Sequence, residues 1–343
     1  MAEVEIRVSG RAGRITLNRP KALNALTHEM ALEIERALRA WREDPRVQLV
    51  VIDGAGDRAF CAGGDIQLLY DRGRAGDFAY GRRFWADEYR LNALIGAYPK
   101  PYVALMDGIV MGGGVGVSAH GSHRVVTERT LLAMPECGIG LVPDVGGTFI
   151  LSRAPGRLGE HLGLTGARVG AGDAILTGFA DVYMRAERLP ALIAELEASG
   201  DPAAIAAMAE PAPEATLAPL RPAIDRAYDA PDALGVVRAL EASDEAWAQD
   251  AARAIRRNCP LSVACALRLI REARALPDLK AALAREYRFS WRCTEEGEFL
   301  EGIRAAVIDK DRSPRWQVAR LEDLPPEKVD AMLAPLGENE LTL

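Results

Sequence analysis

The sequence lacks paired cysteines, long apolar runs and an excess of positive charge, and each absence excludes a class of protein. Its five cysteines are odd in number and widely scattered, and no Cys-x-x-Cys pair occurs. This argues against a disulfide scaffold and a zinc ribbon. His120 and His123 have no third ligand spaced to join them, so we expect no metal site. Free thiols indicate a reducing compartment, and we expect a cytoplasmic protein.

Membranes and nucleic acids are not expected partners. No uncharged apolar run reaches the roughly 18 residues of a membrane span, and the nearest candidate, residues 108–122, is shorter and rich in glycine. The first ten residues carry charge from Glu3 onward and lack the apolar core of a secretory signal. The formal net charge of −7 argues against binding to a phosphate backbone.

The composition is typical of a large globular protein. Of 343 residues, 49% are hydrophobic and 27% are charged, which supports a core without disulfides or metal. Strand-like and helix-like patterns alternate through the first half, which predicts an α/β fold with crossover connections. We expect strands at 4–8, 14–17, 47–52, 101–106, 124–127 and 131–133, and helices at 27–41 (with Thr27 as N-cap), 66–94 (interrupted near 73–76) and 113–120.

Composition also predicts three consecutive segments. Residues 1–185 form the expected α/β core that carries the site. Residues 186–257 are rich in Ala, Glu, Asp and Arg and contain seven prolines, which predicts a helical insert or connector. Residues 258–343 read as a helical C-terminal region that packs on the core, with Leu283 and Tyr287 among its expected core positions.

Two glycine-rich turns follow buried strands and are the first candidates for a site. Gly112-Gly113-Gly114 follows the strand ending near Met106, and Gly63-Gly64 follows the other buried strand. Acyl-transfer chemistry needs two N–H donors that converge on one carbonyl oxygen, and each turn can supply one. The alternative is a pair of tight turns under closely packed helices. Residues 114–119 also fit a dinucleotide-binding pattern, which we discount because the match lies in the middle of the chain.

Glu136 and Asp144 are the candidate acid–base pair. Both lie in an apolar stretch rich in glycine and proline, so burial should raise a carboxyl pKa toward the range of a general acid or base. The alternative is two ordinary loop acids. Asp65 is most simply a helix N-cap, and Glu88 taken alone is most simply a solvated helix residue.

Together these stretches resemble the crotonase (enoyl-CoA hydratase/isomerase) superfamily, and within it most closely the 3-hydroxyisobutyryl-CoA hydrolase subfamily. The similarity spans roughly residues 10–320 and is weakest across 186–257. The stretches that carry it are Asn18-Arg19-Pro20, Leu23-Asn24-Ala25, Phe60–Ile66, Glu88–Asn92, Lys100–Leu105, Gly108–Gly116, Met134-Pro135-Glu136, Pro143–Gly147, Glu301–Ala305, Ile308–Asp311 and Pro314-x-Trp316.

The resemblance implies a fold and a set of site residues. The fold would be a spiral of repeated ββα units with a helical C-terminal region. The backbone amides of Gly64 and Gly113 would be the oxyanion donors. Glu136 and Asp144 would be the catalytic acids, whereas hydratases carry a further glutamate at the position of Gly116. The resemblance places substrate contacts at Glu88, Ala62, Gly63, Asp65, Ile66 and Gly112, with the 62–66 loop binding the CoA adenine.

The implied activity is hydrolysis of a 3-hydroxyacyl-CoA thioester in valine catabolism. Glu136 would either attack the carbonyl or activate water, and Asp144 would hold the 3-hydroxyl group. Coenzyme A is part of the substrate, and no separate cofactor is expected. Two alternatives stay open, an enoyl-CoA hydratase or isomerase and a non-catalytic acyl-CoA-binding homologue. The expected partner is the acyl-CoA, and the sequence leaves homo-oligomerisation open.

Overall fold

The computed structural model describes residues 2–343 and divides into two compact units. Unit 1 comprises the chain up to Gly64 together with Asp87–Ala133 and Arg168–Ala218. Unit 2 comprises Asp65–Ala86, Met134–Ala167 and Pro219–Leu343. The chain therefore enters each unit several times, and the division into three consecutive segments stays a prediction.

Unit 1 is built on a six-stranded sheet with the order β1-β2-β3-β5-β7-β9, which confirms the α/β class. The first pair is antiparallel and every other pair is parallel, as crossover connections require. The strands are β1 (Val4–Ser9), β2 (Ala12–Leu17), β3 (Leu49–Gly54), β5 (Tyr102–Met106), β7 (His123–Val126) and β9 (Val182–Tyr183).

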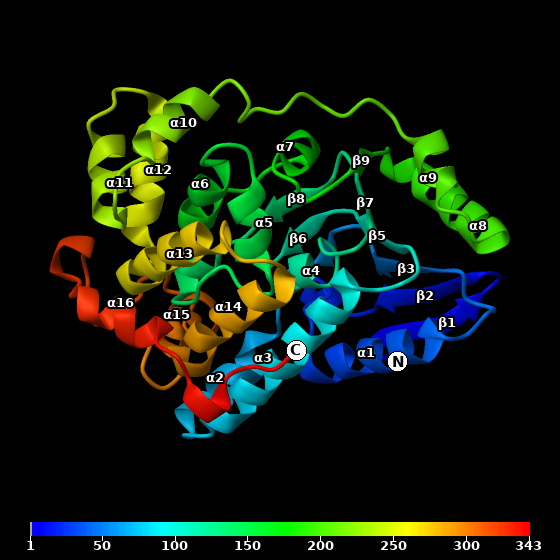
Figure 1. Cartoon of the computed structure of the whole chain (residues 1–343), viewed down its shortest axis with the longest axis horizontal. Coiled ribbons are helices and arrows are strands. Elements are labelled where there is room, and N and C mark those ends of the chain that lie inside the picture. Colours follow the sequence, from blue (N-terminus) through cyan, green and yellow to red (C-terminus); the bar gives the residue numbers. More distant parts are fainter. Residues whose placement is uncertain (1) are drawn as a thin grey trace. The chain divides into compact units, whose positions relative to one another are not determined.

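Helices cover both faces of this sheet (Figure 1). Successive strand residues point to opposite faces. Ala12 belongs to a buried cluster with Leu105 of β5 and Leu192 of α8. Gly13, the next residue, faces α1, and a Cβ atom there would lie 2.5 Å from the ring of Trp41. The covering helices are α1 (His28–Arg42) on one face, and α8 (Leu189–Ser199) and α9 (Ala203–Met208) on the other.

A second sheet of three parallel strands positions the glycine turns. Its strands are β4 (Ala59–Cys61), β6 (Ile109–Met111) and β8 (Leu131–Ala133), in that order. Along the chain each is preceded by a strand of the large sheet and followed by a helix. The ββα repeat that the resemblance implies is therefore present.

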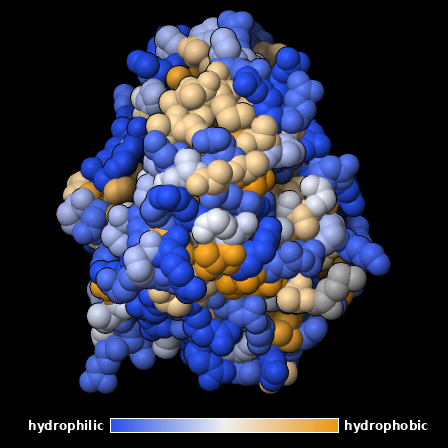
Figure 2. All heavy atoms as spheres, turned by 90° about the vertical axis from the view of Figure 1, so that its right-hand side faces the viewer, coloured by the Kyte–Doolittle hydropathy of each residue, from blue (hydrophilic) through white to orange (hydrophobic). Residues whose placement is uncertain are grey.

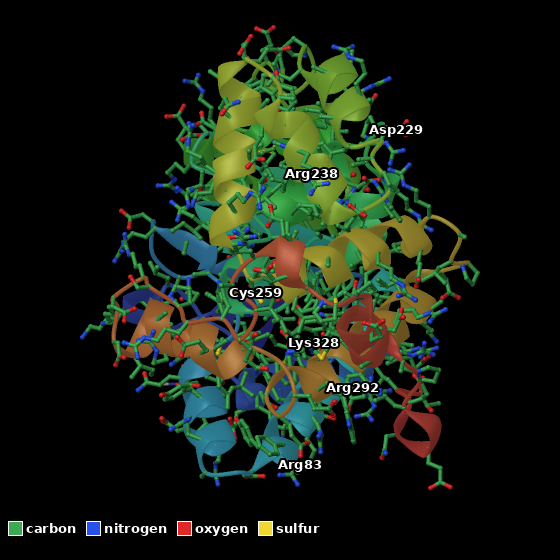
Figure 3. The ribbon with its side chains drawn as sticks, turned by 90° about the vertical axis from the view of Figure 1, so that its left-hand side faces the viewer. Arg83, Asp229, Arg238, Cys259, Arg292 and Lys328 are labelled. Atoms are coloured by element: carbon green, nitrogen blue, oxygen red, sulfur yellow. The ribbon has the colours of Figure 1, made fainter. Side chains whose placement is uncertain are left out.

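Unit 2 consists mainly of helices. Within it, α13 packs against α5 and α6, and α14 packs against α5 and α16. Its buried cysteine Cys259 and the exposed side chains of Arg83, Asp229 and Arg238 are labelled in Figure 3. Besides α1, α8 and α9, the helices are α2 (Ile66–Arg74), α3 (Phe78–Gly96, which continues into unit 1), α4 and α7 (Gly113–Gly116 and Ala171–Leu176, both in unit 1), α5 (Gly147–Arg153), α6 (Leu158–Thr165), α10 (Arg221–Ala227), α11 (Ala233–Glu241), α12 (Ala246–Arg257), α13 (Pro260–Ala273), α14 (Leu279–Cys293), α15 (Phe299–Ile303) and α16 (Pro326–Leu333).

Short 3-10 and π turns connect the longer elements. The 3-10 turns are η1 (Pro20–Ala22), η2 (Glu136–Ile139), η3 (Ala186–Arg188), η5 (Leu321–Asp323) and η6 (Gly337–Asn339), and η4 (Arg304–Ile308) is a π turn. The face in Figure 2 is largely hydrophilic with smaller hydrophobic areas. Among residues 2–343, none of the helices combines the length and the apolar character needed to span a bilayer.

Candidate active site

The two glycine turns lie side by side in unit 1. Strands β4 and β6 pair in parallel, with Ala59 opposite Ile109 and Cys61 opposite Val110. Their carboxyl ends therefore meet at one edge of the small sheet, where α/β folds place ligands. Gly64 follows β4 and Gly113 follows β6 at this edge. A Cβ atom on Gly113 would lie 3.3 Å from the Gly64 nitrogen, so the two backbones are in close approach.

Glycine is required at this edge for two reasons. Gly63 has φ +120°, a conformation that other residues rarely adopt. A Cβ atom on Gly114 would lie 2.3 Å from the Cys61 carbonyl oxygen, which leaves no room for a side chain. Gly113 begins α4, so its N–H has no acceptor within that helix. The turns thus bring the two backbones together at this edge without side chains between them.

A buried asparagine supports the Gly63–Gly64 loop from the preceding segment. The Asn24 side-chain amide donates to the carbonyls of Ala59 (2.8 Å) and Ala55 (3.0 Å). Its oxygen accepts from the Arg19 N–H at 2.9 Å. The Leu26 N–H then donates to the Gly63 carbonyl at 2.8 Å. Arg19 and Asn24, from the Asn18-Arg19-Pro20 and Leu23-Asn24-Ala25 stretches, therefore take part in the hydrogen bonds that support this loop.

Glu88 lies beside Gly113 and is buried, so its interpretation as a solvated helix residue is wrong. The side chain projects from α3, and a Cβ atom on Gly113 would lie 2.8 Å from Glu88 Oε1. Burial raises the pKa of the nearby Cys61 thiol to about 12, and the charge of Glu88 adds to the rise. Cys61 is therefore a protonated, buried thiol.

The remaining predicted contact residues lie in the two glycine turns and at the start of α2. Ala62 and Gly63 belong to unit 1 and precede Gly64, and Gly112 is the N-cap of α4. Asp65 is the N-cap of α2, as expected, but its side chain makes no capping hydrogen bond. Asp65 and Ile66 belong to unit 2. Their roles toward coenzyme A stay predictions.

Glu136, in unit 2, is a buried acid that forms no ion pair with any cation in the described residues 2–343. It begins the 3-10 turn η2 after Pro135 and is only 4% exposed. Its Oε2 atom accepts no hydrogen bond from any described residue. Burial raises the pKa of Glu136 well above the usual value, and the charges of Asp144 and Glu286 raise it further. The rise predicted for this carboxyl is confirmed.

Asp144 belongs to the same unit and is also buried. It lies in the turn before α5, where its carbonyl oxygen accepts the Gly147 N–H at 2.6 Å. Its charge acts on Glu136, so the two carboxyls share one buried environment. Neither is an ordinary solvated loop acid.

A third acid, Glu286 on α14, was not among the predicted site residues. It is 0% exposed, and burial raises its pKa to about 8, with the charge of Asp144 contributing. Its carboxylate accepts from Thr148 and from the Gly146 N–H. The sequence did contain a signal, because Glu286 lies on the same helical face as Leu283 and Tyr287, which were expected in the core.

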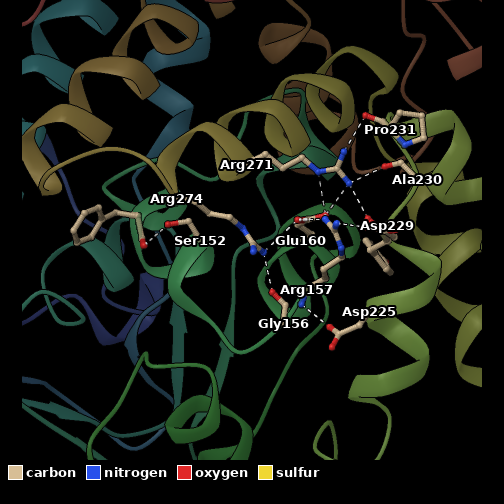
Figure 4. Close-up of polar contacts among 12 residues, drawn as sticks. Ser152, Gly156, Arg157, Glu160, Asp225, Asp229, Ala230, Pro231, Arg271 and Arg274 are labelled. Atoms are coloured by element: carbon tan, nitrogen blue, oxygen red, sulfur yellow. Dashed lines mark hydrogen bonds and ion pairs between the residues drawn. The ribbon is translucent and has the colours of Figure 1, made fainter.

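Glu160, in the same unit, is a buried acid whose negative charge is offset by neighbouring cations (Figure 4). It is also fully buried, but ion pairs join it to Arg157 at 2.9 Å, Arg271 at 3.0 Å and Arg274 at 3.3 Å. Three cations offset the loss of solvation, which is typical of a structural site. Within the described part of the chain, no comparable set of cations surrounds Glu136 or Glu286, so their environment favours proton uptake instead.

Two other features bear on the chemistry. Gly116 closes α4, so the position of the hydratase glutamate carries no carboxyl. Among the described residues, no group of three His, Cys, Asp or Glu side chains is placed to hold a metal ion. The expectations of no metal and no separate cofactor stay predictions.

Comparisons with known proteins show similarity along nearly the whole chain. The model of the enoyl-CoA hydratase/isomerase family matches residues 12–333. A relative from Gallus gallus, named 3-hydroxyisobutyryl-CoA hydrolase, mitochondrial, is 41% identical over 353 residues, covering 100% of this chain and 91% of the relative. A solved enoyl-CoA hydratase from Rhodobacter sphaeroides is 52% identical with a TM-score of 0.95, covering 100% of both chains. A solved carnitinyl-CoA dehydratase from Mycobacterium thermoresistibile is 46% identical with a TM-score of 0.96, covering 100% of this chain and 99% of that one.

The comparisons also correct one expectation. The prediction of a cytoplasmic protein is contradicted, because the Gallus gallus relative is named as mitochondrial. Free thiols report only a reducing environment, and composition alone does not choose among reducing compartments. The family membership, in contrast, is shown by a family match over residues 12–333 and by a relative that is 41% identical over the whole chain. The chain belongs to the enoyl-CoA hydratase/isomerase (crotonase) family.

Proposed function

We propose that this protein is an acyl-CoA thioester hydrolase that cleaves 3-hydroxyisobutyryl-CoA, or a related 3-hydroxyacyl-CoA, to the free hydroxy acid and coenzyme A. The observation that carries the proposal is the pair of buried acids Glu136 and Asp144, combined with the absence of a carboxyl at Gly116. The name of the Gallus gallus relative supports the same substrate and, through it, a place in valine catabolism.

The backbone amides of Gly64 and Gly113 would stabilise the charge that develops on the thioester oxygen. Attack on the carbonyl carbon moves an electron pair onto this oxygen, and two fixed N–H donors are suited to receive it. One such donor contributes roughly 2.7–4 kcal/mol to the transition state. Since backbone amides need no reorganisation, the pair lowers the barrier without a change of conformation.

Glu136 would supply the nucleophilic step in one of two ways. Its carboxylate can attack the carbonyl carbon and expel the CoA thiolate, giving an anhydride that water then hydrolyses. Alternatively it takes a proton from water, whose oxygen forms the new C–O bond as the C–S bond breaks, and the proton passes to the thiolate. Both routes require Glu136 in its ionised form.

Asp144 would recognise the 3-hydroxyl group of the acyl chain. A buried carboxylate that accepts a substrate hydroxyl discriminates strongly, because an acyl chain without it leaves the carboxylate unpaired. Glu88, beside Gly113, would contact the substrate near the thioester.

The alternative activity is enoyl-CoA hydration, for which the Rhodobacter sphaeroides protein is named. Water addition to a double bond uses two acid–base groups, and Gly116 removes one of the two family positions. A third possibility is a homologue that binds acyl-CoA without turnover. The deciding experiment follows thiol release across 3-hydroxyacyl-CoA esters and, in parallel, the loss of the conjugated double bond of crotonyl-CoA. Thiol release supports the hydrolase, loss of the double bond supports the hydratase, and tight binding with neither supports the third possibility.

The proposal predicts a selective effect of Asp144→Ala. Turnover of 3-hydroxyisobutyryl-CoA should fall by roughly 100-fold or more, whereas a plain acyl-CoA such as isobutyryl-CoA should lose much less, because only the former offers a hydroxyl to this site. Measuring kcat/KM for both esters checks this. Equal losses on the two esters would remove the hydroxyl-recognition role of Asp144.

A further inference from the structure

Glu286 is a buried acid that the proposed chemistry does not use. It lies on α14, and its carboxylate accepts the Gly146 N–H at 2.7 Å and the Thr148 N–H at 3.0 Å. The Thr148 hydroxyl donates to the same oxygen as the Thr148 N–H. Three donors from one short segment therefore converge on a single side chain about 140 residues away in sequence.

The segment that Glu286 holds is a tight turn in an unfavourable conformation. The Gly147 N–H donates to the Asp144 carbonyl at 2.6 Å, which closes a four-residue turn. Both central residues have positive φ, +52° at Val145 and +80° at Gly146, as in a type I′ turn. A β-branched residue rarely adopts this conformation, because its side chain clashes with the backbone there. Such a turn persists only where its surroundings hold it.

Glu286 supplies the hydrogen-bond acceptors that the residues at the start of α5 lack. The turn leads into α5, whose N-cap residue Gly146 has no side chain to accept the first helical N–H groups. The first turn of a helix needs such acceptors. The carboxylate of Glu286 takes this role from another helix, and it thereby fixes the turn that begins with Asp144.

We propose that Glu286 is a positioning residue for thioester hydrolysis, whose carboxylate holds the strained Asp144–Thr148 turn and so fixes the Asp144 carboxyl for substrate binding. This inference rests on the proposed function. The titratable groups that act on Glu286 or share its surroundings are Asp144 and Glu136 on the segment before α5, and Cys293 on α14 itself, which also senses the charge of Asp144.

A double-mutant cycle tests whether Glu286 acts through Asp144. Glu286→Gln keeps the volume but places an N–H₂ group where a carboxylate oxygen accepts, so kcat for 3-hydroxyisobutyryl-CoA should fall roughly 10- to 100-fold with a smaller change in KM. In an Asp144→Asn background the same substitution should cost less than about threefold, because coupled residues are not additive. Equal factors in the two backgrounds overturn the proposal.

Relief of the strained turn is an independent test. Val145→Gly removes the β-branched residue from positive φ, so it should restore part of the activity lost in Glu286→Gln. Thr148→Ser, which keeps the hydroxyl donor, should remain close to wild type, whereas Thr148→Val should lose activity roughly 3- to 10-fold. Failure of Val145→Gly to restore any activity, or equal behaviour of the two Thr148 variants, contradicts the positioning role.

The matched control lies on the same helix. Asp278 caps the start of α14 by accepting the Ala281 N–H at 2.9 Å. Asp278→Ala should lower the melting temperature while leaving kcat unchanged, which separates loss of α14 stability from loss of the turn. If the wild type hydrolyses no 3-hydroxyacyl-CoA, the proposed function fails. In that case amide hydrogen exchange still tests the hydrogen bonds between Glu286 and the turn. The Gly146 and Thr148 amides should exchange faster in Glu286→Gln than in Asp278→Ala.

Discussion

A glutamate in water is ionised at neutral pH, but the surroundings of Glu136 oppose that charge. Its carboxyl is buried, lies near the charges of Asp144 and Glu286, and has an oxygen with no hydrogen-bond donor among the described residues. Each factor favours the protonated form. A nucleophile or base must be ionised to act, so the pH dependence of the reaction reports on this residue directly.

Glu136→Gln should therefore nearly abolish thiol release, by roughly 1,000-fold or more, while the fold persists. In the wild type, kcat/KM should rise with pH through a pKa above the usual range of a glutamate, because only the ionised form reacts. The measurement is a pH profile of thiol release for both proteins. Glu298→Gln is the control, since Glu298 is also buried but accepts backbone N–H groups of Gln317 (2.9 Å) and Val318. Unchanged turnover in Glu136→Gln would refute its role.

A substitution at Gly113 tests the backbone amides that are proposed to stabilise the thioester oxygen. Gly113→Ala places a methyl group 2.8 Å from Glu88 Oε1 and 3.3 Å from the Gly64 nitrogen, where the thioester oxygen would need to bind. Since one oxyanion donor is worth about 100- to 1,000-fold in kcat, we expect a loss of at least about 100-fold. Gly170→Ala is the matched control, because a Cβ atom there meets nothing within 4 Å. Similar activity in the two variants would contradict the assigned role of the amides.

At the scale of elements, the sequence predicts best where the signal is local. The first helix is confirmed, including its N-cap, because the Thr27 side chain accepts the Met30 N–H at 3.2 Å. The helix expected at 113–120 ends at Gly116 instead, since small apolar residues alone do not extend a helix past a glycine-rich segment. The ββα repeat has no fixed period in the sequence, because its first strands begin at residues 49, 102 and 123.

The role of Glu286 could not be predicted for a different reason. Its partners, Gly146 and Thr148, are distant in sequence, and no local pattern encodes a hydrogen bond between α14 and the turn before α5. Glycine turns and acid-containing loops were visible because each is a short motif. The side chain that holds such a loop in place depends on tertiary packing, which a single sequence does not display.

Asn24 allows a test of loop support at this scale. Asn24→Ala removes the three hydrogen bonds that this side chain makes to the Ala55 and Ala59 carbonyls and to the Arg19 N–H. Each unpaired buried group costs about 1–3 kcal/mol, so the free energy of unfolding should fall by several kcal/mol, with a loss of thiol release as the Gly63–Gly64 loop loosens. Chemical denaturation measures the first effect. Asn18→Ala, at a half-buried residue, is the control, and equal destabilisation by both would contradict the role of Asn24.

For the whole molecule, the buried acids of unit 2 link stability to pH. Glu286 has a pKa raised to about 8 by burial, and the pKa of Glu136 is also raised. The folded state therefore binds more protons than the unfolded state between the ordinary glutamate pKa and about pH 8, so stability falls as the pH rises through this window. His161 acts in the opposite sense, because burial lowers its pKa to about 4, whereas the unfolded side chain is still half protonated at pH 6.5.

Between pH 6.5 and 8, comparison with Glu286→Gln isolates this one carboxyl, because His161 and the buried thiols contribute equally in both proteins, and the comparison gives the last prediction. The free energy of unfolding should fall with rising pH in the wild type, and Glu286→Gln should reduce this slope by up to about 1.4 kcal/mol per pH unit, the contribution of one proton. Urea denaturation at several pH values in this window measures both slopes. Asp278→Ala should lower stability by a similar amount at every pH, because it removes a helix cap and no buried acid. If the slopes of wild type and Glu286→Gln coincide, Glu286 does not take up the proton, and its carboxylate is ionised in the folded protein at neutral pH.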